Sequence, residues 1–300
     1  MIKKVFGVAI AGAALVVPTT AARAADAVDW QRVGEGITSG ISGIVVDGRD
    51  GSAIDTLAVR DNKNPGESRL VAVRYRPDAA PRVRPVEWSG ELPVDLEALD
   101  AVPGRNHEYV ALASRGTAYR IHVEKGTARI VSTFRLPGNS SDANYEGFAL
   151  SATEDGIVAV WADRGQDDRP AQLTTAKWNP ATNAFGERDS AEFSAPCPHK
   201  DVRHISDVKI SASGELTVSS ASDPGDDGPY DSALYGIGRV SVGDDGHAEV
   251  SVSDEPHRLA AFSGHKVEAL ACLPGSREGI LGTDDENDGG SIAAAGFCSP

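Results

Sequence analysis

Short apolar runs separated by turn residues dominate the sequence from about residue 30 onward. The runs are rich in Val, Ile, Ala and Tyr, and Gly, Asp, Asn or Pro interrupts them every 8 to 12 residues or so, roughly the spacing of short strands. Almost no stretch has the 3.6-residue period of an amphipathic helix. This pattern predicts an all-β protein.

A four-residue pattern recurs along the chain at intervals of about 50 residues. Each copy reads apolar, polar, small or acidic, apolar, and the copies begin at Ile41, Leu96, Tyr145, Ile205 and Val267. After the second copy, turn residues divide the chain into strand-like segments at 96–102, 109–113, 119–123 and 128–134. Four short antiparallel strands per repeat are typical of a propeller blade. The repeat therefore predicts a five-bladed β-propeller.

The two ends of the chain complement each other in this scheme. The last unit supplies only three strand-like segments, whereas a spare segment, 30–37, precedes the first unit. Pairing 30–37 as the outer strand of the last blade closes the ring and protects exposed sheet edges. We therefore expect a single propeller domain at 25–300, with the N-terminal strand closing the last blade. A two-sheet sandwich and an open array of hairpins are the alternatives.

The first 24 residues have the pattern of a secretory signal peptide. Lys3 and Lys4 precede an apolar stretch at 5–17, and Ala22-Arg23-Ala24 provides small residues for cleavage. The apolar stretch is too short for a spanning helix, and no later segment approaches 18 apolar residues. We expect 1–24 to be removed and the mature protein to be secreted or otherwise extracytoplasmic, with no membrane span.

The charge of the chain limits its partners. The net charge is −15, and loss of the three cationic residues of the signal peptide leaves −18. An excess of acid argues against binding of nucleic acid or anionic lipid and favours solubility and cations. We expect a monomer that binds a small molecule or an extracellular partner.

The chain has three cysteines, Cys197, Cys272 and Cys298, so at most one disulfide can form within it. Cys272 and Cys298 fall near the same face of the last predicted blade, which favours that pair. No CxxC spacing indicates a zinc or redox site.

The polar residue of each repeat is expected to line the central channel, because the first strand of a blade faces it. These residues are Ser42, Glu97, Glu146, Ser206 and Glu268. Carboxylates so close together raise one another's pKa unless they are protonated, hydrated or bridged by a cation. Calcium takes about six to eight oxygen ligands, which these side chains and water can supply. Calcium is therefore the predicted cofactor, and simple hydration of the channel is the alternative.

Loops at the mouth of the channel supply candidate catalytic and binding residues. Asp61 and Asp163 are candidate bases. Cationic side chains neutralise phosphate or carboxylate oxygens, and the candidates for this role are Arg115, Arg164, Arg203 and Lys266. An ordinary solvated loop is the alternative for each residue. The chain contains no GxSxG, P-loop or HExxH motif.

The order Ser, Glu, Glu, Ser, Glu at the repeat openings resembles the calcium-activated nucleotidase (apyrase) family. The resemblance implies a five-bladed propeller with the channel calcium held by Ser42, Glu97, Glu146, Ser206 and Glu268. Segment 59–63 departs from the Asp-Asp-Arg-Thr-Gly-type segment of that family, and only Asp61 is carried over from it. Segments 95–99 and 110–116 are similar to the esterase-like, phytase-related exported propellers.

Together these features favour a secreted calcium-binding hydrolase of phosphate compounds, either nucleotides or phosphate esters. A non-catalytic propeller that binds a glycan, peptide or protein, with a structural calcium, is the main alternative, because fold does not specify function. A third possibility is a sugar-cleaving propeller, which requires two or three carboxylates at the separation found in glycosidases.

Overall fold

A computed structural model describes Met1, residues 28–138 and residues 142–299. The predicted signal peptide, Met1 apart, lies outside the described residues. The described chain is all-β, with twenty strands and two short 3-10 helices, η1 (Ile37–Ser39) and η2 (Glu286–Asp288). Neither helix, at three residues each, has the length or apolar character needed to cross a membrane.

The strands form one eight-stranded and three four-stranded sheets. The eight-stranded sheet contains β2 (Gly43–Asp50), β3 (Ala53–Val59), β4 (Leu70–Arg76), β5 (Ala79–Ser89), β6 (Leu96–Ala101), β7 (Glu108–Ala113), β8 (Thr117–Glu124) and β9 (Thr127–Arg135). The next two sheets contain β10 (Tyr145–Thr153), β11 (Gly156–Asp163), β12 (Ala171–Asn179) and β13 (Ala184–Phe193), then β14 (Val202–Ile210), β15 (Glu215–Ser222), β16 (Asp231–Val242) and β17 (Ala248–Ser263). The last sheet contains β1 (Gln31–Gly34), β18 (Val267–Cys272), β19 (Glu278–Thr283) and β20 (Gly290–Gly296).

The eight-stranded sheet consists of two antiparallel meanders, β2–β5 and β6–β9. Only a short parallel pairing of β5 with β9 joins them, from Glu87 opposite Thr127 to Ser89 opposite Arg129. We refer to each meander, and to each of the other three sheets, as a four-stranded unit. The strand that comes first in the chain within β2–β5, β6–β9, β10–β13, β14–β17 and β18–β20 is called its inner strand.

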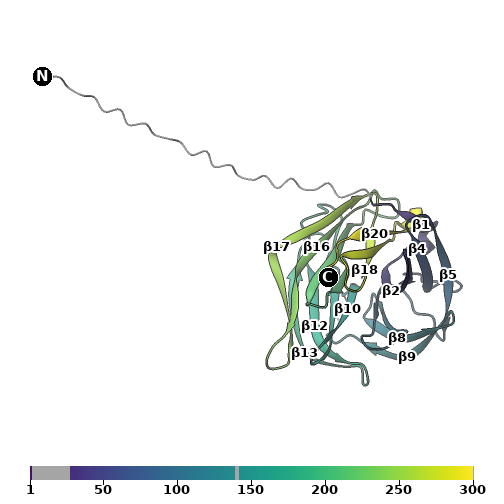
Figure 1. Ribbon diagram of the computed structural model, residues 1–300, viewed down its shortest axis with the longest axis horizontal. Helices are drawn as coiled ribbons and strands as arrows, with labels where there is room; N and C mark the ends of the chain where they lie inside the picture. The colour runs from purple at the N-terminus through teal and green to yellow at the C-terminus, as the bar shows by residue number, and fades with distance from the viewer. Residues whose placement is uncertain (2–27, 139–141, 300) are drawn as a thin grey trace.

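The inner strands contact one another in a closed circle. Strand β2 contacts β6, β6 contacts β10, β10 contacts β14, β14 contacts β18, and β18 returns to β2. Figure 1 shows β2, β10 and β18 near the middle of the ring and the last strands β5, β9, β13 and β17 toward the outside. This is the arrangement of a β-propeller. The all-β propeller prediction is confirmed, and the sandwich and the open array of hairpins are wrong.

The apolar core lies between neighbouring units and not at the centre of the ring. Between the units of β6–β9 and β10–β13, for example, Leu112 packs in one cluster with Phe148 and Trp161, all of which are at most 1% exposed. Similar clusters fill the other contacts between units. Burial of apolar surface between the units holds the ring together. The centre is therefore left to polar side chains.

The first strand of the chain completes the last unit, as predicted. Strand β1 pairs antiparallel with β20, with Gln31 opposite Ile292. The predicted disulfide is also present in this unit, where Cys272 and Cys298 are joined across a Cα–Cα distance of 5.7 Å. Cys197 is a free, half-buried thiol.

Candidate functional site

A cavity of about 540 Å³ lies at the mouth of the central channel. We call it the channel cavity. Nine carboxyl side chains line it, namely Asp61, Asp95, Glu97, Glu146, Asp223, Asp226, Glu268, Asp284 and Glu286. Only four cationic side chains join them, namely Lys63, Arg164, Arg203 and Lys266. Carboxyl groups thus outnumber cations in this cavity.

Three of the five predicted ring residues meet in this cavity. Glu97 of β6, Glu146 of β10 and Glu268 of β18 are all part of its lining. Ser42 and Ser206 are each 1% exposed and do not line the cavity, and their hydroxyl oxygens have no hydrogen-bond partner among the described residues. The repeat pattern therefore located the carboxylates, while the two serines lie outside the lining.

Arg203 of β14 joins two of these glutamates. Its Nη1 lies 2.7 Å from Glu268 Oε1 and 3.4 Å from Glu146 Oε1, and its Nη2 donates to Asp223. Burial alone would lower the pKa of Arg203, but Glu146, Glu268 and Asp223 outweigh it and raise that pKa well above its usual value. Arg164 Nη1 lies 2.9 Å from the same Oε1 of Glu146. Two guanidinium groups thus supply the positive charge that a buried carboxylate needs.

Lys266 neutralises the other side of Glu268. Its side chain is 1% exposed, and its Nζ lies 3.4 Å from Glu268 Oε1 and also donates to Glu286. The ring of Tyr230 lies beneath it, with Nζ 5.8 Å from the centroid. Burial works against the charged ammonium, yet Glu268 and Asp284 raise the pKa of Lys266 overall. Lys266 is therefore a fixed internal cation.

Glu97 differs from the other two glutamates because it forms no hydrogen bond or ion pair with the described residues. Burial, followed by the nearby charges of Glu146 and Asp95, raises the pKa of Glu97 well above its usual value. Asp95 has partners of its own, since Lys63 Nζ lies 2.9 Å from its Oδ1 and Ser114 donates to its Oδ2. Glu97 is thus a carboxyl group without an ion-pair partner, and burial and the nearby carboxyl groups raise its pKa.

Two aspartates of the cavity lining also hold protons more tightly than usual. Burial raises the pKa of Asp284 to about 7, although Lys266 opposes the shift. Burial also raises the pKa of Asp61, and Lys63, whose Nζ lies 3.7 Å away, opposes it. Asp61 therefore lies in the cavity, as predicted, but in an environment that disfavours its charge.

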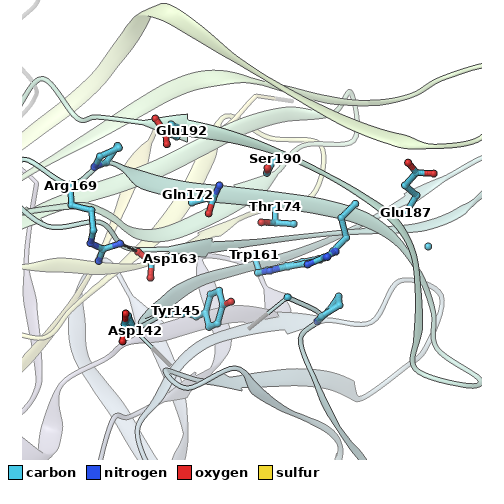
Figure 2. Close-up of a pocket in the computed structure, with 16 residues that line it drawn as sticks. Asp142, Tyr145, Trp161, Asp163, Arg169, Gln172, Thr174, Glu187, Ser190 and Glu192 are labelled. Atoms are coloured by element: carbon cyan, nitrogen blue, oxygen red, sulfur yellow. Dashed lines mark hydrogen bonds and ion pairs between the residues drawn. The ribbon is translucent and has the colours of Figure 1, made fainter. Parts of the chain in front are cut away.

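Two predicted site residues lie away from the channel cavity. Asp163 of β11 lines a second cavity of about 790 Å³ beside the β10–β13 unit. Figure 2 shows its carboxylate beside Arg169. It also accepts backbone N–H groups of Asn144 at 2.9 Å and Gly165 at 3.0 Å, so it supports the neighbouring loops. Arg115 donates to the carbonyl oxygen of Ala143 at 3.3 Å and is not part of the channel lining.

The sequence placed the loops of Asp223, Asp284 and Glu286 at the mouth of the channel, but neither these residues nor Asp95 and Asp226 were among the predicted site residues. Asp95 lies two residues before Glu97, and the others follow the second strand of their unit, as Asp61 does. That shared position indicated that these loops reach the mouth of the channel, but it does not tell which of their side chains line the cavity.

Comparison with known proteins identifies distant structural neighbours. No protein-family profile and no curated protein matches the sequence. Similar solved structures include the Bacteroides ovatus xyloglucan PUL GH43B, at 13% identity and TM-score 0.44 over 83% of this chain and 49% of that chain. The GH43 protein BlXynB from Bacillus licheniformis has 12% identity and TM-score 0.45 over 77% of this chain and 46% of that chain. The α-L-arabinofuranosidase PaAbf62A from Podospora anserina has 11% identity and TM-score 0.45 over 88% of this chain and 96% of that chain. The chain spans about half the length of the first two.

The predicted hydrolysis of phosphate compounds is wrong. The names of these neighbours are those of GH43 and arabinofuranosidase proteins, and the comparisons do not support the resemblance to apyrases or phytase-related propellers beyond the propeller fold. The charges of the cavity give a physical reason. Arg164, Arg203 and Lys266 are all engaged by carboxylates, so a phosphate would meet a surplus of negative charge.

Two of the predicted calcium ligands, Glu146 and Glu268, contact cationic side chains of the protein itself. Among the residues that the structure describes, no group of three or more His, Cys, Asp or Glu side chains is placed to hold a metal ion. The guanidinium of Arg203 lies between Glu146 and Glu268 and supplies the positive charge there. No step of the chemistry below uses a metal, and calcium stays a prediction to be tested.

Proposed function

We propose that this protein is a glycoside hydrolase whose reaction takes place in the channel cavity. Glu97 acts as the general acid, and Glu146 acts as the ionised carboxylate opposite it. The observation that carries the proposal is that one cavity holds two glutamates in different surroundings. Glu97 has no ion-pair partner and a raised pKa, whereas Glu146 contacts two guanidinium groups. Glycosidases use two carboxyl groups whose environments give them opposite protonation states.

The surroundings of Glu97 suit a general acid. An acid catalyst must still carry its proton near the working pH, and burial together with Glu146 raises the pKa of Glu97 well above its usual value. No described residue occupies its carboxyl group by a hydrogen bond or ion pair. The proton of Glu97 is therefore available to a substrate oxygen in the cavity.

The surroundings of Glu146 suit the opposite role. Arg164 and Arg203 both contact its Oε1, which favours a negative charge. Glu146 is only 2% exposed, and its Oε2 is buried without a hydrogen-bond partner among the described residues. A buried acceptor without a partner costs about 1–3 kcal/mol, which a bound substrate or water would recover.

The two groups together balance the reaction. Glu97 gives its proton to the glycosidic oxygen while the bond from that oxygen to the anomeric carbon breaks. Glu146 stabilises the positive charge that develops on the anomeric carbon and takes up a proton from the attacking water. One proton is given and one is taken, so exchange with solvent restores the starting state. A neutral glycan also avoids the repulsion that a phosphate would meet.

The test is hydrolysis of neutral oligosaccharides and of dinitrophenyl glycosides by the wild-type protein, Glu97→Gln and Glu146→Gln. We expect Glu97→Gln to lower kcat on oligosaccharides about 10²- to 10⁴-fold. The loss on dinitrophenyl glycosides should be far smaller, because that leaving group needs no proton. Glu146→Gln should lower both rates.

Glu124→Gln provides the matched control, because that side chain is exposed on β8 and lies outside both cavities. Circular dichroism and melting temperature show that each variant is folded. An unchanged rate in Glu97→Gln, or no hydrolysis of any glycan by the wild-type protein, would contradict the proposal.

We further propose a five-bladed ring, an exported mature protein and a monomer in solution. The first is supported by the short β5–β9 pairing, because only three residue pairs join the halves of the eight-stranded sheet. The second is supported by the disulfide between Cys272 and Cys298, because disulfides persist in oxidising compartments. N-terminal sequencing of secreted protein and its mass in solution test the last two.

A further inference from the structure

The cationic side chains of the channel cavity are all engaged by carboxylates of the same lining. Lys63 Nζ, for example, lies 2.9 Å from Asp95 Oδ1, and Arg164, Arg203 and Lys266 each contact a glutamate. Nine carboxyl groups nevertheless line the cavity against these four cations. Positive charge is therefore what the cavity can still accept from a ligand.

Four of the carboxyl groups come from loops that lie close together, and we call them the acidic wall: Asp61, Asp226, Asp284 and Glu286. The backbone N–H of Asn287 donates to the carbonyl oxygen of Asp226 at 3.2 Å, which joins the β15–β16 connection to η2. Asp284 Oδ1 accepts the backbone N–H of Glu286 at 3.1 Å. Among the described residues, neither Asp226 nor Asp284 has a cation within ion-pair distance. The acidic wall is therefore only partly neutralised by the protein.

The mutual influence of these carboxyl groups is visible in the proton affinity of Asp284. Burial raises the pKa of Asp284 to about 7, and although Lys266 opposes the shift, the charges of Asp61 and Glu286 add to it. A positive charge brought by a ligand would relieve this repulsion.

The cavity also contains a buried acceptor that lacks a donor. Glu146 is 2% exposed and lines the cavity, and its Oε2 has no hydrogen-bond partner among the described residues. A carboxylate only accepts hydrogen bonds, whereas an ammonium group offers three donors and no acceptor. An ammonium group therefore supplies both positive charge and hydrogen-bond donors, which the lining lacks.

The arrangement suits a cation carried on a larger molecule. In the part of the chain that the structure describes, no three His, Cys, Asp or Glu side chains converge as ligands of one metal ion. The volume of about 540 Å³ instead lies within the range of about 300–1,000 Å³ that is usual for small-molecule pockets.

An exposed apolar side chain lies beside the acidic wall. Ile37 is 46% exposed and lines the cavity, and its helix η1 contacts η2, which begins at Glu286. Ligand pockets combine apolar contact surface with a few placed polar groups. The C–H groups of a sugar ring can pack on Ile37 while an amino substituent faces the carboxylates.

We infer that the channel cavity binds sugars that carry a charged amino group, so that glycans of basic amino sugars are the substrate class of this protein. The inference rests on the proposed glycoside hydrolase function and names the class of glycan on which it acts. The acidic wall receives the ammonium group, and Glu97 and Glu146 lie beside the glycosidic bond.

The test is titration calorimetry with β-1,4-linked glucosamine tetrasaccharide and with its N-acetylated counterpart, which differ in charge but not in linkage or length. Glu97→Gln is used for the titrations, because slow cleavage keeps the ligand intact. At about pH 6 the sugar amines are protonated. We expect the amino form to bind at least about tenfold more tightly, as a charge-assisted hydrogen bond allows. The difference should shrink as sodium chloride is added, because salt screens charges.

Asp226→Asn in the same background removes one charge of the acidic wall. It should weaken binding of the amino form several-fold and leave binding of the N-acetylated form unchanged. Asp78→Asn is the matched control, because Asp78 is exposed in the turn between β4 and β5 and lies outside the cavity lining. It removes the same charge from the protein and should change neither affinity. Melting temperatures show that both variants are folded.

The outcomes separate this inference from the proposed function. Equal affinity for the two forms, or an equal loss in Asp226→Asn and Asp78→Asn, would overturn the inference, and hydrolysis of neutral glycans by the wild-type protein would then leave the proposed function intact. Selective binding of the amino form without hydrolysis of any glycan would overturn the proposed function and support the cavity as a binding site for cationic sugars.

Discussion

Removal of Arg203 should destabilise the fold by an amount set by the carboxylates that it leaves behind. In Arg203→Met, Glu268 loses a guanidinium at 2.7 Å and Glu146 loses one at 3.4 Å, while both glutamate side chains are only 3% exposed. Breaking a buried ion pair by deleting one partner costs about 3–5 kcal/mol. We expect the free energy of unfolding at pH 7.5 to fall by about that amount.

The loss should depend on pH. The pKa of Glu268 is already raised well above its usual value by burial, and Lys266 and Arg203 oppose that shift. Without Arg203 this carboxyl group binds a proton more readily, so acid removes the unpaired charge. Arg203→Met should therefore cost clearly less at pH 5 than at pH 7.5. Replacement of Glu268 by Gln in the same chain should recover part of the loss at pH 7.5.

Urea unfolding followed by tryptophan fluorescence measures these differences, provided that the m-value is unchanged. Arg84→Met on the exposed face of β5 is the control and should change the free energy of unfolding by less than about 0.5 kcal/mol. A loss below about 1 kcal/mol for Arg203→Met, or the same loss at both pH values, would refute the assignment of Arg203 as the internal counter-charge.

Three further predictions concern the whole fold. Replacing both Cys272 and Cys298 by Ala opens a link across 26 residues and should cost about 3–4 kcal/mol in urea unfolding, and a cost near zero would contradict this. Burial raises the pKa of Asp207 and of Asp284 in the folded protein to about 7, from the usual value of 3.8 that applies to the unfolded chain. The protonated carboxyl groups therefore stabilise the fold fully when the pH is below the pKa of the unfolded chain, and this contribution is lost as the pH rises through about 7. The melting temperature should accordingly be higher at pH 5 than at pH 8.5, and the opposite order in calorimetry would refute this reading. Calcium added to chelator-treated protein should shift the melting temperature by less than about 1 °C, because Arg203 already neutralises the channel glutamates, and a rise specific to calcium over magnesium would instead support the sequence-based prediction of a calcium site.

Turn residues explain why the strands could be predicted from the sequence. Lys125 and Gly126 both have positive φ angles, 52° and 80°, and they separate β8 from β9 as an Asx-Gly or Gly-Gly pair would. Such two-residue turns fix where one strand ends and the next begins. The missing fourth strand of the last unit likewise indicated that the segment near Gln31 would pair there.

The site was less predictable because its ion pairs depend on long side chains that cross between strands. The repeat placed Glu97, Glu146 and Glu268 correctly, since each occupies the same position on its inner strand. Nothing local distinguishes Arg203, which reaches into the channel, from Arg115, which donates to a loop carbonyl. The direction of a flexible side chain is decided by neighbours that are distant in the sequence.

The pairing of β1 with β20 also governs how the ring can form. Gln31 lies opposite Ile292, so one edge of the final sheet is made from residues at the two extremes of the described chain. A chain that emerges from the ribosome with its N-terminus first cannot make this contact until Ile292 has emerged. Ring closure is therefore the last step available to the chain, and long-range pairing of this kind folds slowly. Until that step the final unit has an unpaired sheet edge, and the protein stays incompletely folded and accessible to chaperones.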